Sequence, residues 1–206
     1  MARRRDIAYN KTMSSRIFLV RHGETAWSKS GQHTGRTDLP LTDQGEAEAR
    51  ELAPRLRAVK FDRVLVSPAQ RARRTCELAG LAQTAVVEPD LAEWDYGDFE
   101  GRRSADILKE RSGWNIFRDG CPRGETPAQV SDRADRLILR LKVLEGVVAI
   151  FSHGHFGRVL AARWIGLPVA GAQGFLLNTA SVSVLGCEHD DPAAPAIALW
   201  NSGAGL

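Results

Sequence analysis

The sequence has few cysteines and no long hydrophobic segment. Its 206 residues include three cysteines, Cys76, Cys121 and Cys187, which are widely spaced and form no Cys-x-x-Cys pair. This pattern does not indicate a disulfide framework or a four-cysteine zinc site. No apolar run approaches the roughly 20 residues that a membrane-spanning helix needs. We therefore expect a cytoplasmic protein with reduced thiols and no contact with a membrane.

Internal repeats, low-complexity segments and interdomain linkers are also missing, and the length suits one domain. Hydrophobic residues make up 43% of the chain and charged residues 26%, which is ordinary for a globular protein. We expect residues 15–206 to form a single domain. Residues 1–14 contain three arginines but no apolar segment of a secretory signal, and they predict a flexible N-terminal extension.

A strong charge of one sign is missing too. The formal net charge is +3, and many basic residues lie among acidic ones, as in residues 46–57. Nucleic-acid binding favours a basic stripe or a known binding module, and neither is visible here. We therefore expect no nucleic-acid partner.

What the chain does have is an alternation of short apolar runs with helical patterns. This alternation predicts an α/β fold, a three-layer sandwich with a mostly parallel sheet. The predicted strands are residues 17–20, 64–66, 85–87, 147–151, 181–185 and 196–200. The predicted helices are residues 43–58, 69–78, 104–110, 127–144 and 157–164, and residues 111–125 predict a structured loop or lid.

The first predicted strand ends in the run Arg21-His22-Gly23. Ligands of open α/β sheets bind at the carboxyl ends of the strands. A histidine is a nucleophile near neutral pH, and the guanidinium fork of an arginine matches phosphate oxygens. The run therefore favours chemistry on a phosphoryl group, with a loop histidine beside a solvated arginine as the alternative.

Three further blocks fit the same kind of site. Ser152-His153-Gly154 follows the predicted strand 147–151, so two histidines at strand ends can meet at one edge of the sheet. Residues 67–75 read Ser-Pro-Ala-Gln-Arg-Ala-Arg-Arg-Thr, and residues 93–101 begin with Glu93 and end in Glu-Gly.

In this order, the four blocks resemble the histidine phosphatase superfamily, the phosphoglycerate-mutase-like enzymes. The family pattern is RHG, SPxxRAxxT, ExxxGxxEG and SHG, and the resemblance covers roughly residues 16–187. It implies a phosphoglycerate-mutase-like fold, transfer through a phosphohistidine, and neither a cofactor nor a metal. It also implies a small phosphorylated metabolite as substrate, and it makes a homodimer plausible.

The resemblance assigns roles to four residues of the phosphate site. His22 is the expected nucleophile, with its ring held by a bond from a backbone carbonyl. Arg21 and Arg71 are expected to grip the phosphoryl oxygens, and His153 to add a further donor. The run His153-Gly154-His155 could also suggest a metal pair, but no set of carboxylate ligands accompanies it.

Glu93 is the expected general acid, which would protonate the leaving alkoxide and later activate water. Its neighbours Trp94 and Tyr96 predict an apolar setting of the kind that raises the pKa of a carboxyl group. Asp95 and Asp98 are competing carboxylates, and the family position favours Glu93.

The expected substrate contacts come from four segments. Ser28 stands where many mutase-like members have asparagine, and it reaches less far. Thr34 and Gly35 match the family's Thr-Gly pair, whose hydroxyl and backbone amide meet phosphate. Arg118 or Arg123 is expected to meet a second phosphate. The full predicted substrate-binding set is Ser28, Thr34, Gly35, Tyr96, Arg118 and Gly154.

Within the family, a short segment between Glu93 and His153 favours a phosphatase over a mutase. Residues 27–32, 93–101 and 114–121 resemble the subgroup of fungal sedoheptulose-1,7-bisphosphatases and mycobacterial acid phosphatases. We therefore expect a phosphomonoesterase that acts on sugar phosphates or bisphosphates. The alternatives are a cofactor-dependent phosphoglycerate mutase and a pseudoenzyme that binds a phosphorylated partner. A serine hydrolase is disfavoured because the sequence contains no GxSxG motif.

Overall fold

A computed structural model describes residues 15–144 and 146–203, and these build one six-stranded sheet. The strand order is β3-β2-β4-β1-β5-β6. The strands β3, β2, β4 and β1 are parallel, whereas β5 is antiparallel to β1 and β6 is antiparallel to β5. The bounds are β1 Arg16–Arg21, β2 Arg63–Val66, β3 Ala85–Val87, β4 Val147–Ser152, β5 Val182–Cys187 and β6 Pro195–Ser202. The predicted α/β fold with a mostly parallel sheet is confirmed.

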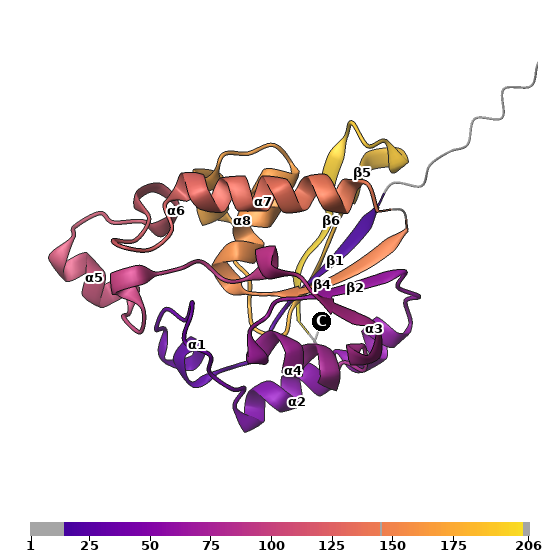
Figure 1. The fold of residues 1–206 in the computed structure, drawn as a ribbon, viewed down its shortest axis with the longest axis horizontal. Helices are drawn as coiled ribbons and strands as arrows, with labels where there is room; N and C mark the ends of the chain where they lie inside the picture. The colour runs from indigo at the N-terminus through magenta and orange to yellow at the C-terminus, as the bar shows by residue number, and fades with distance from the viewer. Residues whose placement is uncertain (1–14, 145, 204–206) are drawn as a thin grey trace, which may run out of the picture.

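Helices cover both faces of the sheet and complete the three layers. The helices α7 and α8 lie on one face, and α2, α3 and α4 lie on the other (Figure 1). Their bounds are α2 Asp43–Glu51, α3 Ala53–Arg57, α4 Gln70–Leu78, α7 Pro127–Lys142 and α8 Gly154–Trp164. Side chains alternate between the faces of a strand, so each central strand supplies both interfaces. In β1, Leu19 joins the hydrophobic core beneath α7 and α8, while Val20 joins the core beneath α2 and α4.

Each predicted helix lies in the predicted part of the chain, but some begin or end at other residues. The helix α7 begins at Pro127, with Thr126 as its N-cap, as predicted, because a proline fits the first helical position. The predicted single helix 43–58 is two helices that meet at Leu52, and Pro54 lies in the first turn of the second. Proline lacks the N–H that would continue the first helix, which explains the break.

The remaining elements are short. The predicted loop 111–125 contains the four-residue helix α6, Ile116–Asp119, and α8 begins three residues earlier than predicted, at Gly154. The other helices are α1 Ala26–Ser30 and α5 Ser104–Glu110. The 3₁₀ turns are η1 Ala82–Thr84, η2 Pro89–Leu91, η3 Gly97–Phe99, η4 Val169–Gly174 and η5 Glu188–Asp190.

The register of β1 and β4 positions the site. Arg21 pairs with Ser152 in the parallel ladder, and the backbone N–H of His22 donates to the Ser152 carbonyl at 3.1 Å. The residues that follow the two strands, His22 and His153, are therefore neighbours. Helices α1, α5 and α6 lie beyond this end of the sheet, on the left of Figure 1.

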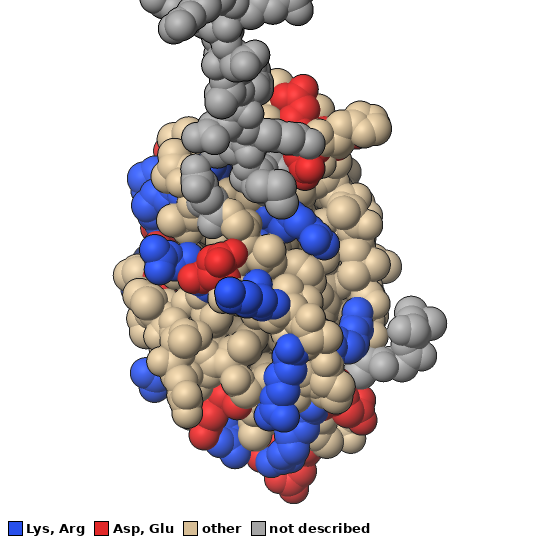
Figure 2. Space-filling view, turned by 90° about the vertical axis from the view of Figure 1, so that its right-hand side faces the viewer, with Lys and Arg blue, Asp and Glu red and all other residues tan. Residues whose placement is uncertain are grey.

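Three expectations concern the outside of the molecule. None of the described helices combines the length and apolar character needed to cross a bilayer. On the face in Figure 2, which lies opposite the helices α1, α5 and α6, basic and acidic side chains both occur among uncharged ones. The flexible extension predicted for residues 1–14 lies outside the described residues.

Candidate active site

A polar cleft opens at the carboxyl ends of β1 and β4. It brings together residues of β1, the loop after it, the 93–96 segment and the first turns of α8. The lining residues are Arg21, His22, Ser28, Gly31, Gln32, His33, Thr34, Glu93, Tyr96, Gly154, His155, Arg158 and Leu177. Segments that are far apart in the sequence thus converge on one site.

His22 is buried, and its ring is held in one orientation. Its Nδ1 lies 2.7 Å from the carbonyl oxygen of Gly23, so Nδ1–H donates to that oxygen and Nε2 keeps its lone pair. Burial lowers the pKa of His22 well below its ordinary value, and the charges of Arg71 and Arg21 lower it further. The imidazole is therefore neutral at neutral pH, as an attacking nucleophile must be.

Arg21 contributes to the cleft a hydrogen-bond donor that has no acceptor. Its guanidinium donates to the Leu177 carbonyl through Nη1, but its Nε is the one buried side-chain nitrogen or oxygen without a partner in the described part of the chain. A Cβ on Gly154 would lie 3.2 Å from the guanidinium carbon, so glycine leaves Arg21 its space. A buried N–H on a cation costs free energy until an anion accepts it.

Arg71 and His153 lie behind the cleft rather than in its wall. Arg71 is fully buried and donates through Nε to His153 Nδ1 at 3.2 Å. Its other nitrogens donate to the carbonyls of Thr34, Gly35 and Thr37, at distances from 3.1 to 3.2 Å. Arg71 thus holds the loop of residues 34–37, and these bonds use four of its five N–H groups.

His153 is likewise engaged at both ring nitrogens. Besides the bond from Arg71, its Nε2 lies 2.7 Å from Ser67 Oγ, so Nε2–H donates to the hydroxyl. The His153 ring is 5.2 Å from the His22 ring, centroid to centroid. Burial and the neighbouring Arg71 lower the pKa of His153 well below its ordinary value. The partner Ser67 belongs to a predicted motif, but its role was not predicted.

Glu93 has a polar setting rather than the apolar one expected. One carboxylate oxygen accepts the backbone N–H groups of Trp94 and Phe156, at 2.9 and 2.8 Å. The other oxygen accepts the N–H of His155 at 3.0 Å. The carboxylate thus caps the N-terminus of α8, where the helix dipole favours negative charge. The sequence concealed this because two of the three amides, those of His155 and Phe156, belong to a segment about sixty residues away.

The strand-end histidine, the unpaired arginine donor and the glutamate that caps α8 lie in a chain that matches a known family. The model of the histidine phosphatase superfamily (branch 1) matches residues 17–202. The chain belongs to this superfamily. The resemblance inferred from the four motifs is thereby confirmed, and the protein is an enzyme of the phosphatase class.

Two relatives and one solved structure are similar over most of this histidine phosphatase. It is 43% identical to an acid phosphatase of Mycobacterium tuberculosis, over 84% of this chain and 87% of that protein. It is 40% identical to the sedoheptulose 1,7-bisphosphatase of Saccharomyces cerevisiae, over 77% of this chain and 70% of that protein. A solved Mycobacterium tuberculosis structure superposes with a TM-score of 0.86 at 40% identity, over 92% of this chain and 98% of that one.

The carboxylates that compete with Glu93 are placed elsewhere. Asp95 accepts the N–H of Gly97 and pairs with Arg36 at 2.8 Å, and Asp98 pairs with the exposed Arg123. Neither carboxylate lines the cleft of this histidine phosphatase. Of these three carboxylates, Glu93 alone lines the cleft.

The structure brings four of the six predicted substrate-binding residues to the cleft, namely Ser28, Thr34, Tyr96 and Gly154. The Ser28 hydroxyl is already used in the capping box of α1, where it accepts the Thr25 N–H at 2.8 Å. The Gly35 N–H donates to both oxygens of Glu100, at 2.9 and 3.1 Å, and Gly35 faces a neighbouring pocket instead.

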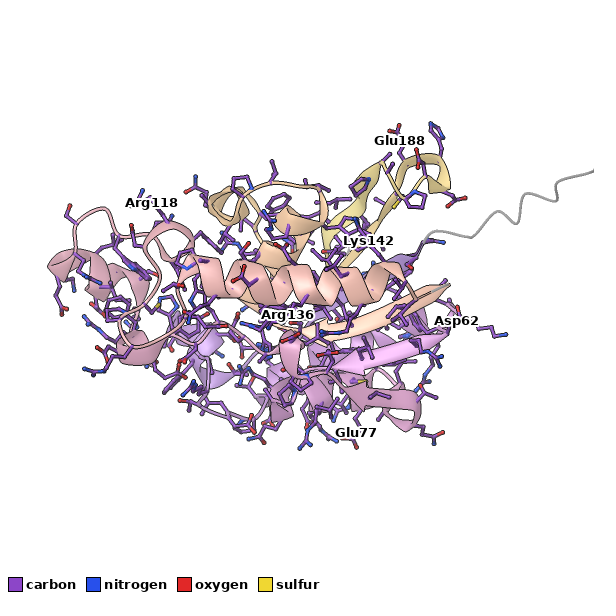
Figure 3. All side chains as sticks on the ribbon, turned by 45° about the horizontal axis from the view of Figure 1, so that its top comes forward. Asp62, Glu77, Arg118, Arg136, Lys142 and Glu188 are labelled. Carbon is purple, nitrogen blue, oxygen red and sulfur yellow. The ribbon has the colours of Figure 1, made fainter. Side chains whose placement is uncertain are left out.

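Arg118 is also outside the cleft. It belongs to α6 at the periphery of the molecule (Figure 3), where it pairs with Asp119 and donates to the Gly113 carbonyl. Arg123, the other candidate for a second phosphate, is 83% exposed and pairs with Asp98. Sequence spacing could not show this, because both arginines lie in the segment whose path depends on tertiary packing.

Metal binding has no support in the geometry. Among residues 15–144 and 146–203, no group of three or more His, Cys, Asp or Glu side chains is arranged to hold an ion. His153 uses both ring nitrogens on Ser67 and Arg71, and His155 Nδ1 lies 2.6 Å from the Tyr96 hydroxyl.

Proposed function

We propose that this histidine phosphatase hydrolyses small phosphomonoesters, with His22 as the nucleophile. The observation that carries the proposal is the Nδ1 bond of His22 to the Gly23 carbonyl, which leaves Nε2 free to attack. The unpaired buried Nε of Arg21 supplies a donor for the phosphoryl group beside it. A nucleophile and an anion-binding donor on one strand end are what in-line phosphoryl transfer requires.

The chemistry proceeds in two steps. His22 Nε2 attacks phosphorus, the P–O bond to the alcohol breaks, and the leaving oxygen takes a proton from Glu93. Because Glu93 accepts three backbone N–H bonds in the free site, that proton enters with the monoanion of the phosphate ester. Water then attacks the phosphohistidine, Glu93 accepts a proton from it, and His22 leaves as a neutral imidazole.

Sugar phosphates are the proposed substrates. The sequence relatives include a sedoheptulose 1,7-bisphosphatase and an acid phosphatase. The cleft itself is lined mostly by polar side chains, which suits a polyhydroxylated ester better than an apolar one. Recognition of a second phosphate by Arg118 is not part of the proposal, because the structure places that side chain outside the cleft.

The test is a panel of four esters: 3-phosphoglycerate, fructose 1,6-bisphosphate, sedoheptulose 1,7-bisphosphate and p-nitrophenyl phosphate. We expect release of inorganic phosphate that the His22→Ala variant loses. The exposed His189 serves as a matched control, because His189→Ala removes an imidazole outside the cleft. Conversion of 3-phosphoglycerate to 2-phosphoglycerate without phosphate release would instead identify a mutase. Binding of an ester without turnover would identify a pseudoenzyme.

We place the reaction in the cytoplasm. Cys76 and Cys121 form no disulfide, and burial raises the pKa values of their thiols to about 12, which keeps them protonated and unreactive. A homodimer is a further part of the proposal, and light scattering on the purified chain tests it.

A further inference from the structure

One wall of the cleft is built from three side chains to which the proposed chemistry assigns no step. They are His33 in the loop after α1, Tyr96 in the segment before η3, and His155 in the first turn of α8. The His33 ring stacks on the Tyr96 ring at 4.6 Å between centroids, with an angle of 21° between the planes. The His155 ring lies 5.6 Å from that of His33.

Each imidazole of this wall is anchored through one nitrogen. His155 Nδ1 lies 2.6 Å from the Tyr96 hydroxyl, and burial raises the pKa of Tyr96 well above its ordinary value. The phenol therefore keeps its proton and donates it to Nδ1, so His155 Nε2 carries a hydrogen. His33 Nε2 lies 3.3 Å from the Ser104 hydroxyl, which can donate or accept.

The second nitrogen of each imidazole is open to the cleft. His33 Nδ1 and His155 Nε2 have no hydrogen-bond partner among residues 15–144 and 146–203, and neither belongs to the buried unpaired atoms there. Burial lowers the pKa of His33 to about 4. Burial also lowers the pKa of His155 well below its ordinary value, with His33, Arg158 and Arg21 adding to the effect. The wall thus presents two uncharged polar nitrogens.

The charged neighbour of the wall is already held in place. Arg158 lines the cleft, but its Nε and Nη2 donate to the carbonyls of Ala172 and Gln173 at 3.2 and 3.1 Å. Its guanidinium also lies over the Phe117 ring at 4.5 Å from the centroid. The wall offers hydrogen bonds from neutral rings next to the phosphate site, and these suit hydroxyl groups.

We propose that His33 and His155 select the substrate by hydrogen bonding to hydroxyl groups of the sugar whose phosphate lies at His22. This inference rests on the proposed function and deepens it. A hydroxyl can donate to or accept from an imidazole nitrogen, so it fits either tautomer of His33. A site with buried polar groups built for hydroxyls discriminates against an ester that leaves those groups unpaired.

The test compares two esters in two variants at position 33. The esters are p-nitrophenyl phosphate, which has no sugar hydroxyls, and whichever of the two sugar bisphosphates of the panel wild type hydrolyses faster. His33→Phe keeps a ring that can stack on Tyr96 but removes the open nitrogen. His33→Asn keeps a polar group but removes the ring.

We expect His33→Phe to lower the ratio of kcat/KM for the sugar bisphosphate to that for p-nitrophenyl phosphate by about tenfold or more, the effect of one hydrogen bond. His155→Phe should act in the same direction. His33→Asn should retain more of this ratio than His33→Phe. His189→Phe, at an exposed histidine outside the cleft, should leave the ratio unchanged.

An equal loss on both esters in His33→Phe, or no change of the ratio, would overturn the inference. The inference would also be refuted if wild type hydrolysed p-nitrophenyl phosphate but neither sugar bisphosphate. In that case the phosphatase proposal would stand. Wild type that hydrolyses none of the esters would refute the proposed function itself.

Discussion

The two ends of the cleft are held by different forces. At the phosphate end, backbone groups fix the chemistry: the Gly23 carbonyl orients His22, and three amides hold Glu93. At the other end, the proposed sugar end, side chains hold each other: His33 stacks on Tyr96, which bonds to His155. Backbone geometry follows from strand register and helix position and is hard to vary. A stack of side chains can change with single substitutions, so it suits a site that sets specificity.

Removal of the proposed nucleophile, His22, should have the largest effect on activity. We expect His22→Ala to lower kcat by about 10⁴-fold or more, as loss of an activated nucleophile does. Rapid acid or base quench with a ³²P-labelled ester should trap a phosphoenzyme in wild type and none in the variant. Full activity of His22→Ala would contradict the mechanism.

Glu93→Gln should lower kcat by about 10²- to 10⁴-fold, the usual contribution of a general acid–base group. The loss should be greatest for alcohols that leave poorly, because those need the proton most. A series of aryl and alkyl phosphates measures this dependence. The same loss for every leaving group would assign Glu93 a purely structural role as the cap of α8.

The sugar end should make stability depend on pH. The pKa of His33 is about 4 in the folded protein and about 6.5 in the unfolded chain. The unfolded state therefore binds the extra proton between these values, so the contribution to stability is complete above pH 6.5 and is lost as the pH falls toward 4. We expect a loss of the order of 3 kcal/mol from this group.

Denaturant unfolding of wild type and His33→Phe between pH 7 and pH 4 measures that contribution. The variant should show a shallower decline in the free energy of unfolding, because its ring cannot be protonated. Parallel curves for the two proteins would show that His33 is not buried as a neutral ring.

The loop of residues 34–37 contributes Thr34 to the cleft, and two side chains of opposite charge hold it. Glu100 accepts the N–H groups of Gly35 and Thr37, while Arg71 donates to the loop carbonyls. We expect Glu100→Gln to raise KM by about three- to tenfold, with a smaller change in kcat, as loss of one charge-assisted hydrogen bond predicts. Steady-state kinetics on the best ester measure the split.

Glu110→Gln is the matched control for that variant. Its exposed carboxylate pairs with Arg102 at 2.6 Å and makes no hydrogen bond to residues 34–37, all of which the structure describes. Equal KM values in Glu100→Gln and wild type would show that the loop does not depend on this carboxylate.

The smallest effect should come from Arg118→Ala. Because Arg118 lies outside the cleft and pairs with Asp119, the preference for a bisphosphate over a monophosphate should stay unchanged. The ratio of kcat/KM for fructose 1,6-bisphosphate to that for fructose 6-phosphate checks this. A fall in the ratio would restore Arg118 as a contact of the second phosphate.

Much of the fold and part of the site could be predicted from local patterns. The apolar runs before Arg21 and Ser152 predict parallel strands, and strand ends place His22 and His153 together because the side chains must follow the backbone. The break at Leu52 was missed although Pro54 signals it, because a proline inside a helical pattern ends or kinks the helix. The helix α6 was missed because its four residues carry only a weak local signal.

Four motifs in the sequence identify the family and point to the residues of the expected phosphate site. Contacts between distant segments set how those residues are used. Glu93 accepts amides of α8, Arg71 holds a loop, and Arg118 lies outside the cleft. The physical reason is that hydrogen-bond partners and burial arise between segments distant in sequence. Local residue patterns place a side chain on an element, whereas packing decides what it touches.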